Sequence, residues 1–88
     1  MLDKKRILIV DDEEDFAQLS QIRLEDAGYD VFTESNGDKV MDRVKELKPD
    51  LVVLDIMLLG EDGFSLLKKL KKKLRVCWDD GEFKEAYQ

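Results

Sequence analysis

The chain has 88 residues, of which 43% are hydrophobic and 41% charged, and its formal net charge is -6. This composition is typical of one globular domain with a charged surface, and the negative charge argues against general nucleic-acid binding. A single cysteine, Cys77, and no histidine exclude an internal disulfide and argue against a structural zinc site or histidine-based catalysis. The sequence shows no apolar run of membrane-spanning length and no signal peptide, so we expect a cytoplasmic location and no membrane partner.

The first predicted elements are a strand, a helix and a second strand. Residues 6–10 are apolar and rich in β-branched side chains, which is typical of a parallel strand buried on both faces. An amphipathic helix follows over residues 13–27, with an apolar stripe that includes Phe16 and Ile22. Residues 30–33 form a second, weaker strand.

The second half of the chain continues the alternation of helix and strand. A helix is predicted over residues 36–47, and Pro49 prevents its continuation. Residues 51–54 repeat the design of the first strand, an apolar run followed by an aspartate, and a third helix covers residues 62–74. Residues 75–78 are a candidate fourth strand, and the remaining chain gives no signal for a fifth. Three βα units and this candidate strand predict an α/β fold with a parallel sheet.

Five consecutive acids, residues 11–15, follow the first strand directly. Ligands of open parallel sheets bind beyond the carboxyl ends of the strands, where the strand order reverses. If the first and third strands are neighbours, Asp11 and Asp12 face Asp55 across a shallow pocket. Crowded carboxylates resist ionisation, and oxygen-only ligands favour Mg2+ as the cation that relieves the repulsion. Residues 13–15 fit a helix start, where the dipole favours negative charge.

The alternative is that all five acids only cap and solubilise the helix. For residues 13–15 we prefer this interpretation. For Asp11 and Asp12 alone the choice would be even, and the third acid, Asp55, at the matching end of a matching strand favours a metal site.

At residues 5–74 the chain resembles the receiver domain of two-component response regulators, in the segments ILIVDDEEDF, PDLVVLD and DIMLLGEDGFSLLKKL. The resemblance implies a flavodoxin-like fold in which Asp55 accepts a phosphoryl group from a histidine kinase. It also implies that Asp12 binds Mg2+ directly and that Asp11 helps through water. The backbone carbonyl of Met57 would complete the metal ligands.

The chain also departs from this family, which has five βα units. The family places a Ser or Thr after the fourth strand and a Lys after the fifth, and neither can be assigned here. We therefore expect an incomplete flavodoxin-like sheet, with residues 1–74 as a receiver-like domain. Residues 75–88 are a divergent tail, a short strand or a swapped segment. The loss of the last units should expose the stripe of the first helix and favour a homodimer through the sheet edge or the tail.

These expectations define one function and one alternative. The first is a phosphoacceptor module whose partner is a histidine kinase or a phosphotransfer protein, and which is not an enzyme except for self-phosphorylation at Asp55. At this length we expect no attached DNA-binding domain, so output would pass through protein contact. The alternative is a truncated, non-switching interaction or dimerisation fragment that retains the acidic pocket as a relic. A phosphatase acting on outside substrates is least favoured, because no general acid or substrate-binding domain is visible.

Overall fold

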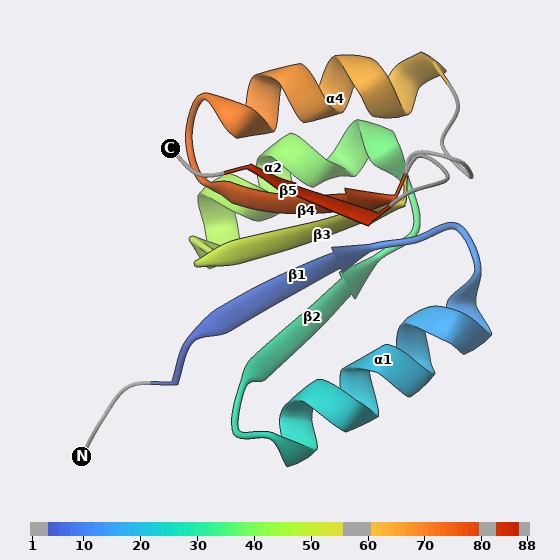
Figure 1. Ribbon diagram of the computed structural model, residues 1–88, viewed down its shortest axis with the longest axis vertical. Helices are drawn as coiled ribbons and strands as arrows, with labels where there is room; N and C mark the ends of the chain where they lie inside the picture. The colour runs from blue at the N-terminus through green and yellow to red at the C-terminus, as the bar shows by residue number, and fades with distance from the viewer. Residues whose placement is uncertain (1–3, 56–60, 80–82, 87–88) are drawn as a thin grey trace.

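A computed structural model describes residues 4–55, 61–79 and 83–86, which form a five-stranded sheet with helices on both faces (Figure 1). None of the helices in these ranges has the length and hydropathy to span a membrane. The elements in chain order are β1 (Arg6–Val10), α1 (Glu14–Asp26), β2 (Asp30–Glu34), the short 3-10 helix η1 (Gly37–Lys39), α2 (Val40–Leu47), β3 (Leu51–Asp55), α4 (Glu61–Lys71), β4 (Arg75–Asp79) and β5 (Phe83–Ala86).

The strand order is β2-β1-β3-β4-β5, so the chain leaves β1 on one side and returns to its other side. The pairs β1/β2, β1/β3 and β3/β4 are parallel. Helical crossovers of one hand connect such parallel strands, which leaves few arrangements for this series of elements. The predicted parallel α/β sheet, with the first and third strands as neighbours, is confirmed.

The C-terminal segment contains two strands, where the sequence predicted at most one. β4 confirms the candidate strand at residues 75–78 and covers the outer edge of β3. β5 pairs with β4 in antiparallel orientation, so the expectation that nothing further downstream forms a strand was wrong. The four residues of β5 carry little local signal for a strand. They form one because the edge of β4 offers unpaired backbone groups for hydrogen bonding.

The core has two parts of unequal size, because successive side chains of a strand point to opposite faces of the sheet. The face under α2 and α4 holds a cluster of ten buried residues, among them Leu8, Leu54 and Leu70. The face under α1 holds a cluster of four, Ile7, Ile9, Ala17 and Val31. Among the described helices, α1 is the one on this second face, where it packs against β2 and β1 (Figure 1).

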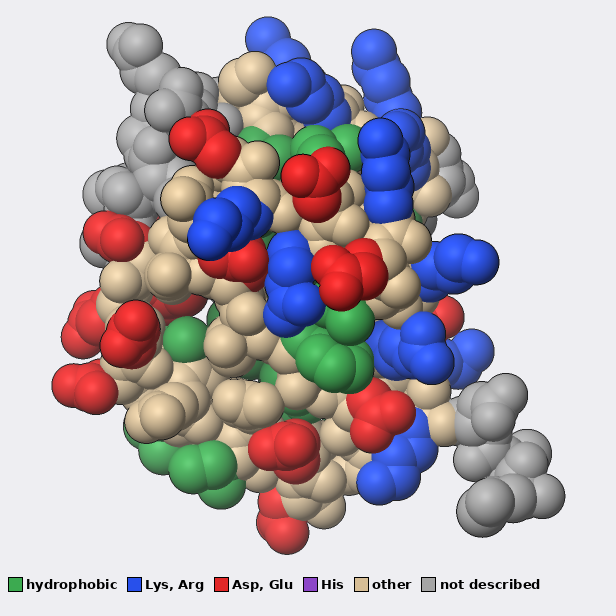
Figure 2. Space-filling view, turned by 180° about the vertical axis from the view of Figure 1, so that it is seen from behind, with side chains coloured by type: hydrophobic (Ala, Val, Ile, Leu, Met, Phe, Trp, Pro, Cys, Tyr) green, Lys and Arg blue, Asp and Glu red, His purple; other side chains and the backbone are tan. Residues whose placement is uncertain are grey.

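Large apolar side chains of α1 are exposed to solvent. Phe16 is 58% exposed, Leu19 47% and Ile22 63%. Hydrophobic side chains reach the surface at the lower edge of the molecule, over this helix (Figure 2). The prediction that the stripe of the first helix would be exposed is therefore confirmed.

Candidate functional site

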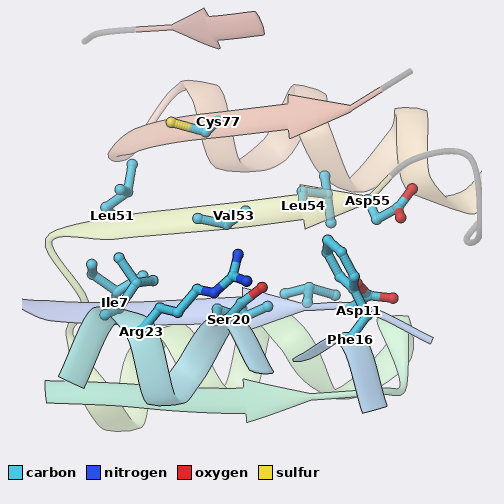
Figure 3. A pocket seen from close by; sticks show the side chains of 13 residues that line it. Ile7, Asp11, Phe16, Ser20, Arg23, Leu51, Val53, Leu54, Asp55 and Cys77 are labelled. Atoms are coloured by element: carbon cyan, nitrogen blue, oxygen red, sulfur yellow. The ribbon is translucent and has the colours of Figure 1, made fainter. Parts of the chain in front are cut away.

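The carboxyl ends of β1 and β3 meet at one edge of the sheet. The register pairs Val10 with Leu54, so Asp11 and Asp55 follow at matching positions. Both side chains line the same cavity of about 440 Å³, and Figure 3 shows their carboxylates at the same end of it, with the ring of Phe16 beside them. The structure thus brings together two of the four predicted ligand positions.

Asp11 is the buried acid of this edge, with 4% of its surface exposed. Its backbone N–H donates a hydrogen bond to the carbonyl oxygen of Glu34 (3.1 Å), which fixes the chain as it leaves β1. Its Oδ1 accepts a hydrogen bond from the N–H of Glu13 (2.9 Å), at the entry to α1. Two backbone contacts therefore hold this carboxylate at the end of the strand.

Burial raises the pKa of Asp11 above its ordinary value, because the charged form loses its hydration. The hydrogen bond from the Glu13 N–H opposes this rise, and the negative charges of Asp55, Glu13 and Asp12 add to it. The edge therefore carries an excess of negative charge, which a bound cation would offset.

Asp12 lies in the bend between β1 and α1 and is exposed, and Met57 falls outside the described residues. Within the described ranges, no group of three or more histidine, cysteine, aspartate or glutamate side chains is arranged to hold a metal ion. The chemistry of the donors nevertheless fits Mg2+, since all are oxygens and the buried carboxylate is surrounded by like charge. Glu14 and Asp15 lie in the first turn of α1, as predicted.

A further acid at this edge was missed in the sequence. The register of β3 and β4 pairs Asp55 with Asp79, the last residue of β4. Aligning the candidate strand at residues 75–78 with residues 51–54 would have found this neighbour. In the register of the sheet it occupies the strand end where the resembled family has a hydroxyl.

Comparisons with known proteins agree with this arrangement. The family described as "Response regulator receiver domain" matches residues 7–77. The alkaline phosphatase synthesis transcriptional regulatory protein PhoP of Bacillus subtilis is 46% identical over 69 residues. The alignment covers 78% of this chain and 29% of PhoP, so the chain spans less than a third of that relative's length.

Solved structures show the same fold. The BeF3-activated N-terminal receiver domain of Klebsiella pneumoniae RstA superposes with a TM-score of 0.76 at 33% identity, over 84% of this chain and 65% of that one. Vibrio cholerae chemotaxis protein CheY4 gives a TM-score of 0.77 at 23% identity, over 86% of this chain and 68% of that one, a likeness that concerns the fold alone. The flavodoxin-like, receiver-type sheet predicted from the sequence is thereby confirmed.

Proposed function

Because the chain belongs to the family of response regulator receiver domains of two-component signalling, we propose that Asp55 accepts a phosphoryl group from a histidine kinase or a phosphotransfer protein. The observation that carries this proposal is the convergence of Asp11 and Asp55 at the ends of adjacent parallel strands, in one cavity. At such an edge, side chains from different strands can act on one ligand.

The reaction needs a carboxylate nucleophile and a positioned phosphoryl group. A carboxylate oxygen of Asp55 attacks the phosphorus atom and forms a P–O bond. The P–N bond to the partner's histidine breaks, and its electron pair returns to the imidazole nitrogen. The product is an acyl phosphate on Asp55, and the protein's contribution is mainly positioning and charge stabilisation.

In this proposal, the carboxylates of Asp11, Asp12 and Asp55 and the backbone carbonyl of Met57 would hold Mg2+. When bound, the ion neutralises charge on the phosphoryl oxygens. The hydrogen bond from Glu13 occupies one oxygen of Asp11 and so orients the carboxylate.

The wider setting belongs to the same proposal. We place the protein in the cytoplasm, with no nucleic-acid or membrane partner and no activity on outside substrates. A homodimer through the sheet edge or the tail remains a prediction. The family membership does not favour the alternative of a non-switching fragment with a relic pocket.

The proposal is tested by intact mass after incubation with Mg2+ and acetyl phosphate. The parent should gain one phosphoryl group, and Asp55→Asn should gain none. Asp42→Asn, which removes an exposed acid from α2, is the matched control and should be modified like the parent. A parent that is folded by circular dichroism and remains unmodified would refute the assignment of Asp55.

A further inference from the structure

The strand β2 forms one edge of the described sheet, with β1 as its neighbour there (Figure 1). An edge strand presents a row of backbone groups to which a strand of another chain can bond, and this makes it a site of unwanted association. Whether another strand can add to the sheet at β2 therefore depends on the partners that its outward-facing backbone groups find within the chain.

Alternate residues of β2 direct their backbone groups toward β1. The N–H of Asp30 donates to the carbonyl oxygen of Lys5 (2.9 Å), and the carbonyl oxygen of Glu34 accepts from the N–H of the residue that follows β1 (3.1 Å). In a parallel ladder, the N–H and C=O of one residue point to the same side of the strand, and those of the next residue point to the other side. The carbonyl oxygens of Val31 and Thr33 therefore face outward, away from β1.

Both outward-facing carbonyl oxygens accept a hydrogen bond from a side chain. The Nε2 of Gln21, in α1, donates to the carbonyl oxygen of Val31 (3.0 Å). The Nη2 of Arg43, in α2, donates to the carbonyl oxygen of Thr33 (3.5 Å), and an ion pair between its Nε and Oε1 of Glu34 (3.6 Å) supports this longer contact. Because α1 and α2 pack on opposite faces of the sheet, one side chain reaches the edge from each face.

These contacts compete with an added strand, which would need the same two carbonyl oxygens as acceptors for its own N–H groups. Displacing Gln21 and Arg43 only exchanges existing hydrogen bonds for new ones, so pairing gains less than at an edge that water alone had solvated. The acids of β2 oppose a second copy as well. In an antiparallel pair centred on Phe32, Asp30 of one copy would lie opposite Glu34 of the other, and like charges in that position are destabilising.

We propose that Gln21 and Arg43 hold the outer edge of β2 closed to pairing with a strand of another protein chain. Each side chain takes one of the two carbonyl acceptors that such a strand requires. The closure depends on neither metal binding nor phosphorylation, because none of its contacts involves the carboxylates of the phosphoacceptor site. Loss of these two side chains, with the fold intact, should therefore open the sheet to an added strand.

The test uses a synthetic peptide of about nine residues, enough to span the five residues of β2. Its centre repeats residues 31–33, and a lysine stands on each side, where an antiparallel strand would face Asp30 and Glu34. Binding is followed by NMR titration of isotope-labelled protein, which reports both the affinity and the residues that the peptide contacts. Circular dichroism of each variant shows whether the fold is intact.

The double variant Gln21→Ala/Arg43→Ala should bind the peptide about tenfold more tightly than the parent, because two modest hydrogen bonds no longer compete with it. The shifts should centre on residues 30–34. Gln21→Ala alone changes no charge and should tighten binding about threefold. Gln18→Ala/Lys45→Ala makes the same two substitutions at exposed positions of the same helices and should bind like the parent.

A further variant locates the binding. Thr33→Pro, added to the double variant, should abolish the gain in affinity, because proline blocks the outer edge while the N–H that it removes does not bond to β1. A folded double variant that binds no better than the parent would overturn the proposal, and so would a gain that survives Thr33→Pro. If the double variant does not fold, Gln21→Ala decides the question, and an affinity equal to that of the parent refutes the closure.

Discussion

Replacing Asp11 by asparagine should stabilise the metal-free protein at neutral pH. Asp11 is 4% exposed and lies among the acids Asp55, Glu13 and Asp12. Asparagine has nearly the same shape and retains an oxygen that can accept the hydrogen bond from Glu13, so the substitution removes mainly the charge.

The size of the effect follows from the neighbours. Each like-charge contact of this kind is worth a few tenths of a kcal/mol, and three of them together with the cost of burial give about 1 kcal/mol in the free energy of unfolding. For a domain of this size, that corresponds to a rise of about 5 °C in Tm. Asp12→Asn makes the same charge change at an exposed residue and should shift Tm by less.

The pH dependence has a definite sign. Since the folded-state pKa of Asp11 is raised above the ordinary value of 3.8, the protonated form favours folding. Its contribution is complete below the ordinary pKa and is lost as the pH rises through the folded-state pKa. The advantage of Asp11→Asn over the parent should therefore be largest near neutral pH and shrink toward pH 4.

The assay is thermal unfolding followed by circular dichroism, in a metal chelator and then with Mg2+ added. In chelator, Tm should be highest for Asp11→Asn, intermediate for Asp12→Asn and lowest for the parent. With Mg2+ the parent should gain stability and Asp11→Asn should gain less, because the variant offers the cation one charge fewer. An Asp11→Asn protein that unfolds below Asp12→Asn in chelator would refute the view that this carboxylate is destabilising.

Two further predictions concern other parts of the molecule. In urea unfolding, Leu70→Ala should lower the free energy of unfolding by about 3 kcal/mol, because Leu70 is fully buried. Leu19→Ala, at an exposed position of α1, should lower it by less than about 1 kcal/mol. Lys48 ends α2 in a left-handed conformation (φ 49°), so Lys48→Gly should raise the free energy of unfolding by about 0.5 kcal/mol. Lys45→Gly, inside the helix, should lower it by about 1 kcal/mol. Equal effects at both positions would refute the cap assignment.

Most of the fold could be predicted because its signals are local. The apolar runs at residues 6–10 and 51–54 can be buried only as inner strands, and an acid directly after each run must lie at the carboxyl edge of the sheet. The exposed stripe at Phe16 and Ile22 was also predicted, since a helix with an apolar face needs a partner that the chain did not offer. β5 could not be predicted, because its four residues have no strong strand pattern of their own. They become a strand only because the edge of β4 is available for pairing.

The candidate site, like the fold, could be predicted only in part. That several acids would gather where strands end could be inferred from the order of apolar and acidic residues along the chain. Which of these acids lie close to one another depends on the three-dimensional packing. Asp11 and Asp12 are chemically identical neighbours, yet hydrogen bonds and the bend after β1 bury one and leave the other exposed. Asp79 stands beside Asp55 only through the pairing of β3 with β4, because a register joins residues that local sequence cannot connect.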